Sequence, residues 1–269
     1  MKELRYQALS VLLEPDPQTK CFAARNLQDA LSADAIAVDV GVILQEPQRL
    51  PGRPEHPLLV APHQVPRRGV GSAAGRAALL HAVAHIEFNA INLALDAIWR
   101  FADMPCAYYK DWMLVASEEA FHFTLLRERL ETYGVTYGDL PAHDGLWEAA
   151  EKTRFDLLAR MALVPRTLEA RGLDVTPALR DKLAEAGDLD SAAVLDVILR
   201  DEVGHVAIGN RWYHYLCERE GRSSLTAHAE LARHYDAGLP RPPFNWEARQ
   251  RAGFNEADLL YFQDLQPPR

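Results

Sequence analysis

The strongest constraint on the fold is a four-residue pattern that occurs twice. Glu119-Ala-Phe-His122 and Glu202-Val-Gly-His205 each place a glutamate three residues before a histidine. Positions i and i+3 are neighbours on a helix surface, so each pattern presents a carboxylate and an imidazole side by side. Two such helices that face each other can hold two metal ions between them. The chain is therefore expected to fold as helices that bring the two patterns together.

Two upstream glutamates complete this arrangement. Glu87 lies 32 residues before Glu119, and Glu169 lies 33 residues before Glu202. In helical two-metal sites, two helices each give one glutamate and two others each give a Glu-x-x-His pair. We therefore predict six metal ligands: Glu87, Glu119, His122, Glu169, Glu202 and His205. Because Glu169 lies near the predicted end of its helix, Glu148 and Glu151 are alternatives to it.

The ligand types point to iron or manganese. Two hard ions about 3.5 to 4 Å apart need bridging carboxylates to offset their charge, and imidazoles leave other coordination positions open. Four glutamates and two histidines meet that need. We expect iron, with manganese as the alternative. A single Glu-x-x-His pair is usually a solvated surface feature, but two pairs with matching upstream glutamates favour a metal site.

An acidic residue stands immediately before each metal-binding glutamate. A histidine that binds a metal usually donates its other N–H to a carboxylate. We therefore predict that Glu118 supports His205 and that Asp201 supports His122. The alternative is that both acids are exposed to solvent.

Helical periodicity and chain breakers predict an all-α fold with a four-helix bundle. The first two long helices are predicted at 74–103 and 105–133, and Gly134 caps the second. The third is predicted to kink at Pro165 and to end near Arg171, with Gly172 as its cap. The fourth is predicted to run from Asp190 or Ser191 to residue 220. Prolines between residues 43 and 70 predict an extended segment over the surface. Shorter helices are predicted at 1–13, 16–32, from Thr176-Pro177 to Gly187, and near the C-terminus.

This pattern divides the chain into three predicted parts. Residues 1–73 form N-terminal helices and the extended segment, 74–221 form the bundle, and 222–269 form a C-terminal extension that packs on it. With 269 residues, 48% of them hydrophobic, the chain can bury a large core. No apolar run approaches the roughly 18 residues that cross a membrane, so we expect no membrane association and a cytoplasmic location. Three separated cysteines, Cys21, Cys106 and Cys217, are expected to be reduced and buried.

The motifs also carry a family resemblance. The ligand pattern is similar to that of the ferritin-like di-iron carboxylate superfamily. The surrounding segments His81-Ala-Val-Ala-His-Ile-Glu87, Glu118-Glu-Ala-Phe-His122, Leu168 to Asp174 and Asp201-Glu-Val-Gly-His205 resemble one family of unknown function within it, from about residue 10 to the end. Bacterioferritins and a tRNA-modifying hydroxylase share the ligand set. The resemblance implies a ferritin-like four-helix bundle with extra terminal helices.

Two functions follow as expectations from this resemblance. The first is a dinuclear enzyme that uses O2 or peroxide to oxidise or hydroxylate a small organic substrate. The second is a non-catalytic protein that binds or handles iron, in which case it could form an oligomer. The net charge of -9 disfavours nucleic acid as a partner, although tRNA stays open through the resemblance. Leu126 stands where ribonucleotide reductase small subunits carry their radical tyrosine, so a radical of that kind is not expected.

Four further residues have two interpretations each. His81 and His85 point away from Glu87 on an ideal helix, so packing or hydrogen bonding is favoured over metal binding. Trp112 lies two turns before Glu119 and is expected to close one end of the site as core packing, with stacking on a substrate as the alternative. Gly209, one turn after His205, marks either an open pocket beside the metals or close helix packing.

Overall fold

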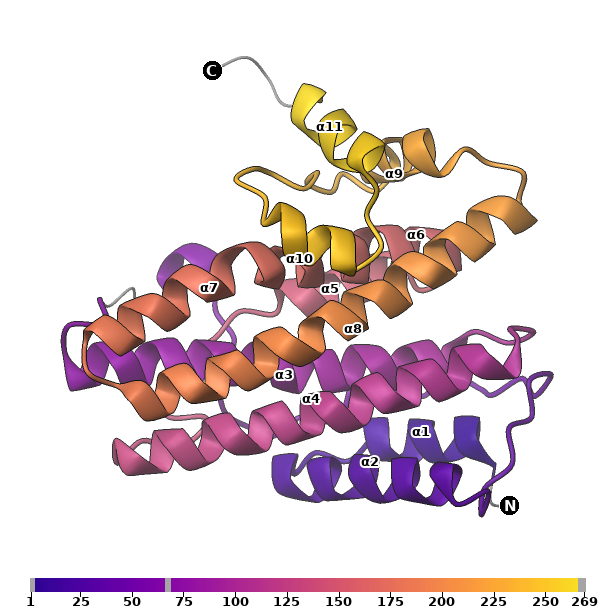
Figure 1. The fold of residues 1–269 in the computed structure, drawn as a ribbon. Coiled ribbons are helices and arrows are strands. Elements are labelled where there is room, and N and C mark those ends of the chain that lie inside the picture. The colour runs from indigo at the N-terminus through magenta and orange to yellow at the C-terminus, as the bar shows by residue number, and fades with distance from the viewer. Residues whose placement is uncertain (1–2, 66–68, 266–269) are drawn as a thin grey trace. The chain divides into compact units, whose positions relative to one another are not determined.

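The computed structural model describes residues 3–65 and 69–265, and this part of the chain is all-helical, without β-strands (Figure 1). The fold-class prediction is confirmed at that level. The helices are α1 Leu4–Leu12, α2 Pro17–Ser32, η1 Pro62–Gln64, α3 Ala73–Arg100, α4 Cys106–Thr132, α5 Gly145–Lys152, α6 Leu157–Leu163, η2 Val164–Glu169, α7 Ala170–Glu185, α8 Leu189–Arg219, α9 Ser224–His234, α10 Trp246–Arg251 and α11 Glu256–Asp264.

The chain forms two compact units. Unit 1 consists of Met1–Trp147 with Leu183–Val194, and unit 2 consists of Glu148–Lys182 with Leu195–Arg269. The limits of these two units differ from the limits of the three predicted parts, 1–73, 74–221 and 222–269.

Unit 1 is built on the pair of long helices α3 and α4. Helix α1 packs against α3, and α2 packs against α4. The Ser72 hydroxyl caps α3 by accepting a hydrogen bond from the Gly75 amide at 3.1 Å. Gly134 follows α4 with a φ of 67°, the left-handed conformation expected of a helix end. The predicted limits of both helices are confirmed to within a few residues.

Helix α3 is long and apolar enough to cross a membrane by length and composition alone, in contrast to the sequence expectation. In the structure, however, 72% of its most apolar 18-residue window is buried within the protein. The helix also buries the charged or polar groups of His81, Glu87, Asn92 and Asp96. These features are those of a core helix.

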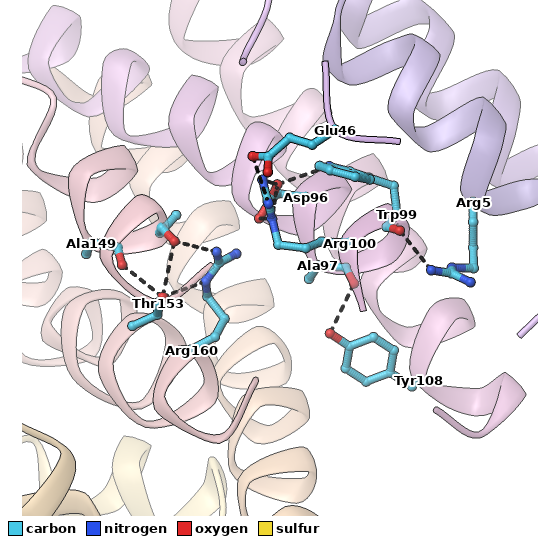
Figure 2. Close-up of polar contacts among 11 residues, drawn as sticks. Arg5, Glu46, Asp96, Ala97, Trp99, Arg100, Tyr108, Ala149, Thr153 and Arg160 are labelled. Carbon is cyan, nitrogen blue, oxygen red and sulfur yellow. Dashed lines mark hydrogen bonds and ion pairs between the residues drawn. The ribbon is translucent and has the colours of Figure 1, made fainter. Parts of the chain in front are cut away.

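The C-terminal end of α3 is satisfied by a buried arginine from α1. The last carbonyls of a helix have no partner within the helix and need one from elsewhere. Arg5 donates from Nε to the Ile98 carbonyl at 3.1 Å and from Nη2 to the Trp99 carbonyl at 2.8 Å. Figure 2 shows its guanidinium directed at the Trp99 carbonyl. Its Nη1 reaches the Val42 carbonyl at 2.5 Å, so one side chain joins α1, α3 and the extended segment.

The extended segment is fastened to α3 a second time. Asp96, fully buried, accepts hydrogen bonds from the Trp99 indole at 3.0 Å and from Arg100 Nη2 at 2.8 Å. Arg100 also pairs with Glu46 at 3.0 Å (Figure 2). The described part of the 43–70 region contains only the short helix η1, as its prolines predict.

A buried lysine holds α2 in unit 1. Lys20 is fully buried, and its ammonium donates to the carbonyls of Leu12 at 3.2 Å and Gly52 at 2.8 Å, and to the Asn92 side chain at 2.5 Å. It also lies 4.9 Å from the centre of the Phe88 ring. Burial lowers the pKa of Lys20 to about 7. The folded protein therefore holds this proton less tightly than the unfolded chain does.

This shift predicts a pH dependence of stability. Between pH 7 and about 10.4, the unfolded lysine is protonated while the folded one loses its proton, so the free energy of unfolding rises with pH. Replacing Lys20 by Met removes this contribution, which is at most about 1.4 kcal/mol per pH unit. Guanidinium unfolding at pH 7, 8 and 9 measures it. If the free energy of unfolding changes equally with pH in wild type and Lys20→Met, Lys20 keeps its proton throughout this range.

Unit 2 departs from the predicted third helix. Helix α6 runs into the π-helix η2 and then into α7 without a break. Pro165 lacks the N–H that an α-helical turn requires, and the chain widens there into i to i+5 bonding. The predicted end at Arg171 with a Gly172 cap is wrong, because both residues lie inside α7. The predicted helix start at Thr176-Pro177 is also wrong, since Pro177 lies within the same helix.

Two smaller expectations also need correction. Asp188, rather than Asp190 or Ser191, caps α8, because its Oδ1 accepts the Ser191 amide hydrogen bond at 3.2 Å. Cys106 is exposed at the first residue of α4, whereas Cys21 and Cys217 are buried as expected. All three thiols are free.

Candidate metal centre

Unit 1 brings three of the predicted ligands together. Glu87 on α3 and Glu119 and His122 on α4 each offer one ligand atom, and these atoms lie within 4.8 Å of one another. His122 Nδ1 lies 3.3 Å from Glu87 Oε2 and 3.4 Å from Glu119 Oε2. Glu87 is 3% exposed, and the other two are fully buried. The antiparallel α3–α4 pair thus places the upstream glutamate at the level of the Glu-x-x-His pair.

Burial governs the charge of this group. It raises the pKa of Glu87 well above its usual value, and the nearby Glu119 carboxylate raises it further. For His122, burial by itself would lower the pKa, but the hydrogen bonds to Glu119 and Glu87 raise it to about 11. Two buried carboxylates thus draw a positive charge to the imidazole between them.

These three residues fit a metal ion. Their donor atoms are two carboxylate oxygens and one imidazole nitrogen, the set that iron and manganese accept. Burial disfavours the charged form of Glu87, and a divalent cation would offset this cost by stabilising both carboxylates as anions. A metal ion at Nδ1 would replace the proton that the imidazole carries.

The second Glu-x-x-His pattern has the same local geometry in unit 2. His205 Nδ1 on α8 lies 3.7 Å from Glu202 Oε1, close to the separation within the first pattern. His205 is 1% exposed, and the Glu202 side chain is 12% exposed. Both patterns therefore turn Nδ1 toward the glutamate one turn earlier, as the i, i+3 spacing predicts.

Glu169 is half-buried at the last position of η2, whereas Glu148 and Glu151 are exposed. Glu169 lies 18 residues before Gly187, and His205 lies 18 residues after it. A short connection joins α7 to α8, so two positions equally far from Gly187 are expected at one level. Within the described residues, Glu169 does not join a group of three ligand atoms as close as that in unit 1. Its burial favours it over the two alternatives.

Close packing between η2 and α8 supports this register. A Cβ added to Gly209 would lie 2.4 Å from the Cβ of Pro165, so the helix backbone touches the proline ring. Pro165 and Gly209 are again equally far from Gly187, at 22 residues each. The structure therefore supports the packing interpretation of Gly209 rather than the pocket interpretation.

A buried arginine anchors η2 to the C-terminal helices. Arg166 is fully buried and forms an ion pair with Asp258 of α11 at 2.7 Å. It donates a short hydrogen bond to Asn210 of α8. Its guanidinium lies 4.5 Å from the Phe254 ring centre and 4.7 Å from that of Tyr213. The position of the segment that carries Glu169 therefore depends on residues near the C-terminus.

Helix α7 is anchored in the same way. Arg249 of α10 forms a two-point ion pair with Asp174, from Nε at 2.9 Å and from Nη2 at 2.8 Å. Both side chains are 1% exposed. Arg249 also donates to the Ala170 carbonyl at 3.2 Å, one residue after Glu169. No spacing rule links positions 75 or more residues apart, so these anchors were not predicted from the sequence.

His81, His85 and Trp112 lie in the core and contact other residues of unit 1. His85 Nδ1 contacts the Tyr137 hydroxyl at 2.9 Å, and His81 Nε2 accepts the Gly138 amide hydrogen bond at 3.0 Å. Burial lowers the pKa of both histidines to about 4. Their prediction as packing and hydrogen-bonding residues is confirmed. Trp112 is 2% exposed and packs edge-on to Tyr108, in agreement with core packing.

The predicted support of His205 by Glu118 and of His122 by Asp201 remains a prediction. Glu118 lies half-buried on α4. Asp201 is bonded to the adjacent Arg200, whose Nε lies 2.7 Å from Asp201 Oδ1. The Asp201 side chain is only 14% exposed, against 67% for Arg200. Asp201 is therefore not the fully solvated acid of the alternative interpretation.

Comparison with known proteins assigns the chain to a family. The family model described as "Protein of unknown function (DUF455)" matches residues 13–260, which include all six predicted ligands. The chain belongs to the DUF455 family. It is 44% identical over 269 residues to an uncharacterized protein of Haemophilus influenzae strain Rd, with 97% of this chain and 93% of the relative covered. No solved structure matches the chain. The predicted membership of a family of unknown function is confirmed, while the ferritin-like relationship remains an expectation for this DUF455 protein.

The two glycines of α8 provide a matched test of the packing at Gly209. Gly209→Ala forces a methyl group against Pro165 and should lower the free energy of unfolding by about 1 to 3 kcal/mol. A Cβ at Gly204 meets nothing within 4 Å, so Gly204→Ala should raise the free energy of unfolding by about 0.5 to 1 kcal/mol. Denaturant unfolding measures both. A neutral or stabilising Gly209→Ala would place open space beside Pro165.

Asp201→Asn tests the supporting role of this acid. The amide keeps the size of the side chain but cannot strengthen an imidazole ligand as a carboxylate does, so metal affinity should fall about 10- to 100-fold. The matched control is Asp190→Asn on the same helix, an exposed acid far from the ligands. Metal titration of both variants gives the answer. Equal affinities would restrict Asp201 to its contact with Arg200.

Proposed function

We propose that this DUF455 protein is a dinuclear metal protein of ferritin-like type that oxidises or hydroxylates a small organic substrate with O2 or peroxide. The observation that carries the proposal is the buried group of Glu87, Glu119 and His122. The second Glu-x-x-His pattern supports it by repeating the same ligand pair in unit 2. The six ligands are those of the sequence prediction, and iron is the expected metal, with manganese as the alternative.

The ligand residues have distinct parts in this proposal. Glu119 and Glu202 each stand one turn before a histidine and share a helix face with it. Glu87 and Glu169 come from the preceding helices. When bound, the two metal ions would supply redox equivalents and open coordination positions at which O2 or peroxide reacts.

The surrounding chain fixes these ligands. Phe88 and Phe123, which follow Glu87 and His122 in the chain, pack with Tyr137 with ring centres 4.9 to 5.7 Å apart. Glu87, Glu119 and His122 are themselves buried, so the carboxylates lie in a medium of low polarity. In unit 2, Arg166 and Arg249 hold the segment around Glu169. A rigid, dry ligand set is what positions a reactive metal ion.

Metal content provides the first test. Protein treated with chelator and reloaded anaerobically with ferrous iron should bind two ions per chain, measured by elemental analysis. His122→Ala or His205→Ala should lower this number, because each removes a neutral nitrogen ligand. Glu148→Gln, an exposed glutamate on α5, is the control and should keep both ions. Full occupancy in both histidine variants would rule out this ligand set.

A stability measurement adds a readout that does not depend on activity. A metal that binds only the folded state stabilises it by about 4 kcal/mol at 1,000 times its Kd. Ferrous iron should therefore raise the Tm of wild type and of Glu148→Gln by the same amount, and raise that of Glu119→Gln by less. An equal increase in the Glu119 variant would show that iron binds elsewhere.

Oxygen uptake then separates an enzyme from a protein that handles iron. An oxidase continues to consume O2 when reductant and substrate are supplied. An iron-handling protein stops after one oxidation of each bound ion. Sustained uptake by wild type that His122→Ala abolishes supports the enzyme, and a single stoichiometric uptake overturns it in favour of iron handling.

A further inference from the structure

A cleft on the surface of unit 1 lies between α2 and α4, apart from the metal ligands. Its volume is about 450 Å³, within the range of small-molecule sites. The apolar part of its lining comes from Cys21, Phe22 and Phe123. Cys21 and Phe123 are buried, whereas Phe22 is 70% exposed at the mouth. An exposed aromatic beside a cleft is a common feature of ligand sites.

Two arginines, one on each helix, line this cleft. Arg25 belongs to α2 and Arg127 to α4. Within residues 3–65 and 69–265, neither forms an ion pair with a carboxylate, whereas Arg76, Arg100 and Arg129 of the same unit all do. Asp29 is the single carboxylate among the lining residues. The cleft therefore offers two positive charges that the described chain leaves without ion pairs.

The two arginines lie at different levels along the cleft. Arg25 lies over the Phe121 ring, 5.7 Å from its centre. On α4, Arg127 lies six residues after Phe121, about 9 Å further along that helix at a rise of about 1.5 Å per residue.

We propose that this cleft binds an elongated organic acid that carries an acidic group at each end and an apolar middle. Arg25 and Arg127 each bind one acidic group. The polar side chains of Gln18 and Asn26 line the same cleft and can donate further hydrogen bonds. The apolar middle of the ligand covers Cys21, Phe22 and Phe123. A ligand with one acidic group reaches only one arginine and binds more weakly.

Isothermal titration calorimetry on the full chain tests this proposal with three compounds of the same length. Azelate has a carboxylate at each end, nonanoate has one, and 1,9-nonanediol has none. Azelate should bind at least tenfold more tightly than nonanoate, and the diol should bind least. Each charge-assisted contact contributes enough for about a tenfold effect.

Arginine variants give the decisive comparison. Arg25→Gln and Arg127→Gln should each weaken azelate binding about tenfold, to the level of nonanoate with wild type. Arg154→Gln is the matched control, because Arg154 also lies over an exposed ring, that of Phe155, at 4.6 Å but lines no part of this cleft. It should leave azelate binding unchanged. Circular dichroism melting checks that all three variants fold.

Three results would overturn the proposal. They are azelate binding no tighter than nonanoate, azelate binding that neither arginine variant changes, and no azelate binding by folded wild type. None of these outcomes depends on metal loading, so the experiment tests this cleft independently of the metal centre.

Discussion

The structure of unit 1 depends on the burial of negative charge in its core. Glu87 and Glu119 lie in an apolar interior, where an uncompensated carboxylate is costly. The imidazole of His122 lies within 3.4 Å of a carboxylate oxygen of each, and its hydrogen bonds to them raise its pKa to about 11 against the effect of burial. A stable fold could avoid this cost with apolar residues of similar size. The presence of these acids beside a buried histidine supports the proposal that the site binds a metal cation.

Buried basic side chains fasten the outer segments to the helices that carry the ligands. Arg5 and Lys20 attach α1, α2 and the extended segment to α3 in unit 1. Arg166 and Arg249 attach α10 and α11 to η2 and α7 in unit 2. Each of the four bonds several acceptors, so its replacement by a small side chain would leave buried polar groups without partners. The terminal extensions thereby help to set the positions of the ligand helices.

The sequence predicted the local structure of the site better than its supports. Helical periodicity and the i, i+3 rule depend only on neighbouring residues, and they placed Glu119, His122 and the limits of α3 and α4 correctly. At Pro165, where a kink was predicted, the chain forms the π-helix η2, and the helix then continues as α7 through Gly172. That outcome depends on packing against Gly209 and on Arg166, contacts between distant residues that no local pattern records. The role of Asp201 and the assembly of all six ligands stay predictions for the same reason.

Anomalous diffraction from crystals of the iron-loaded protein, measured at the iron absorption edge, tests the central claim most directly. Two strong peaks per chain are expected, one of them within bonding distance of His122 Nδ1 and of the carboxylates of Glu87 and Glu119, and the other bound by His205. A map without a peak at His122, or with iron only at surface acids, would contradict it.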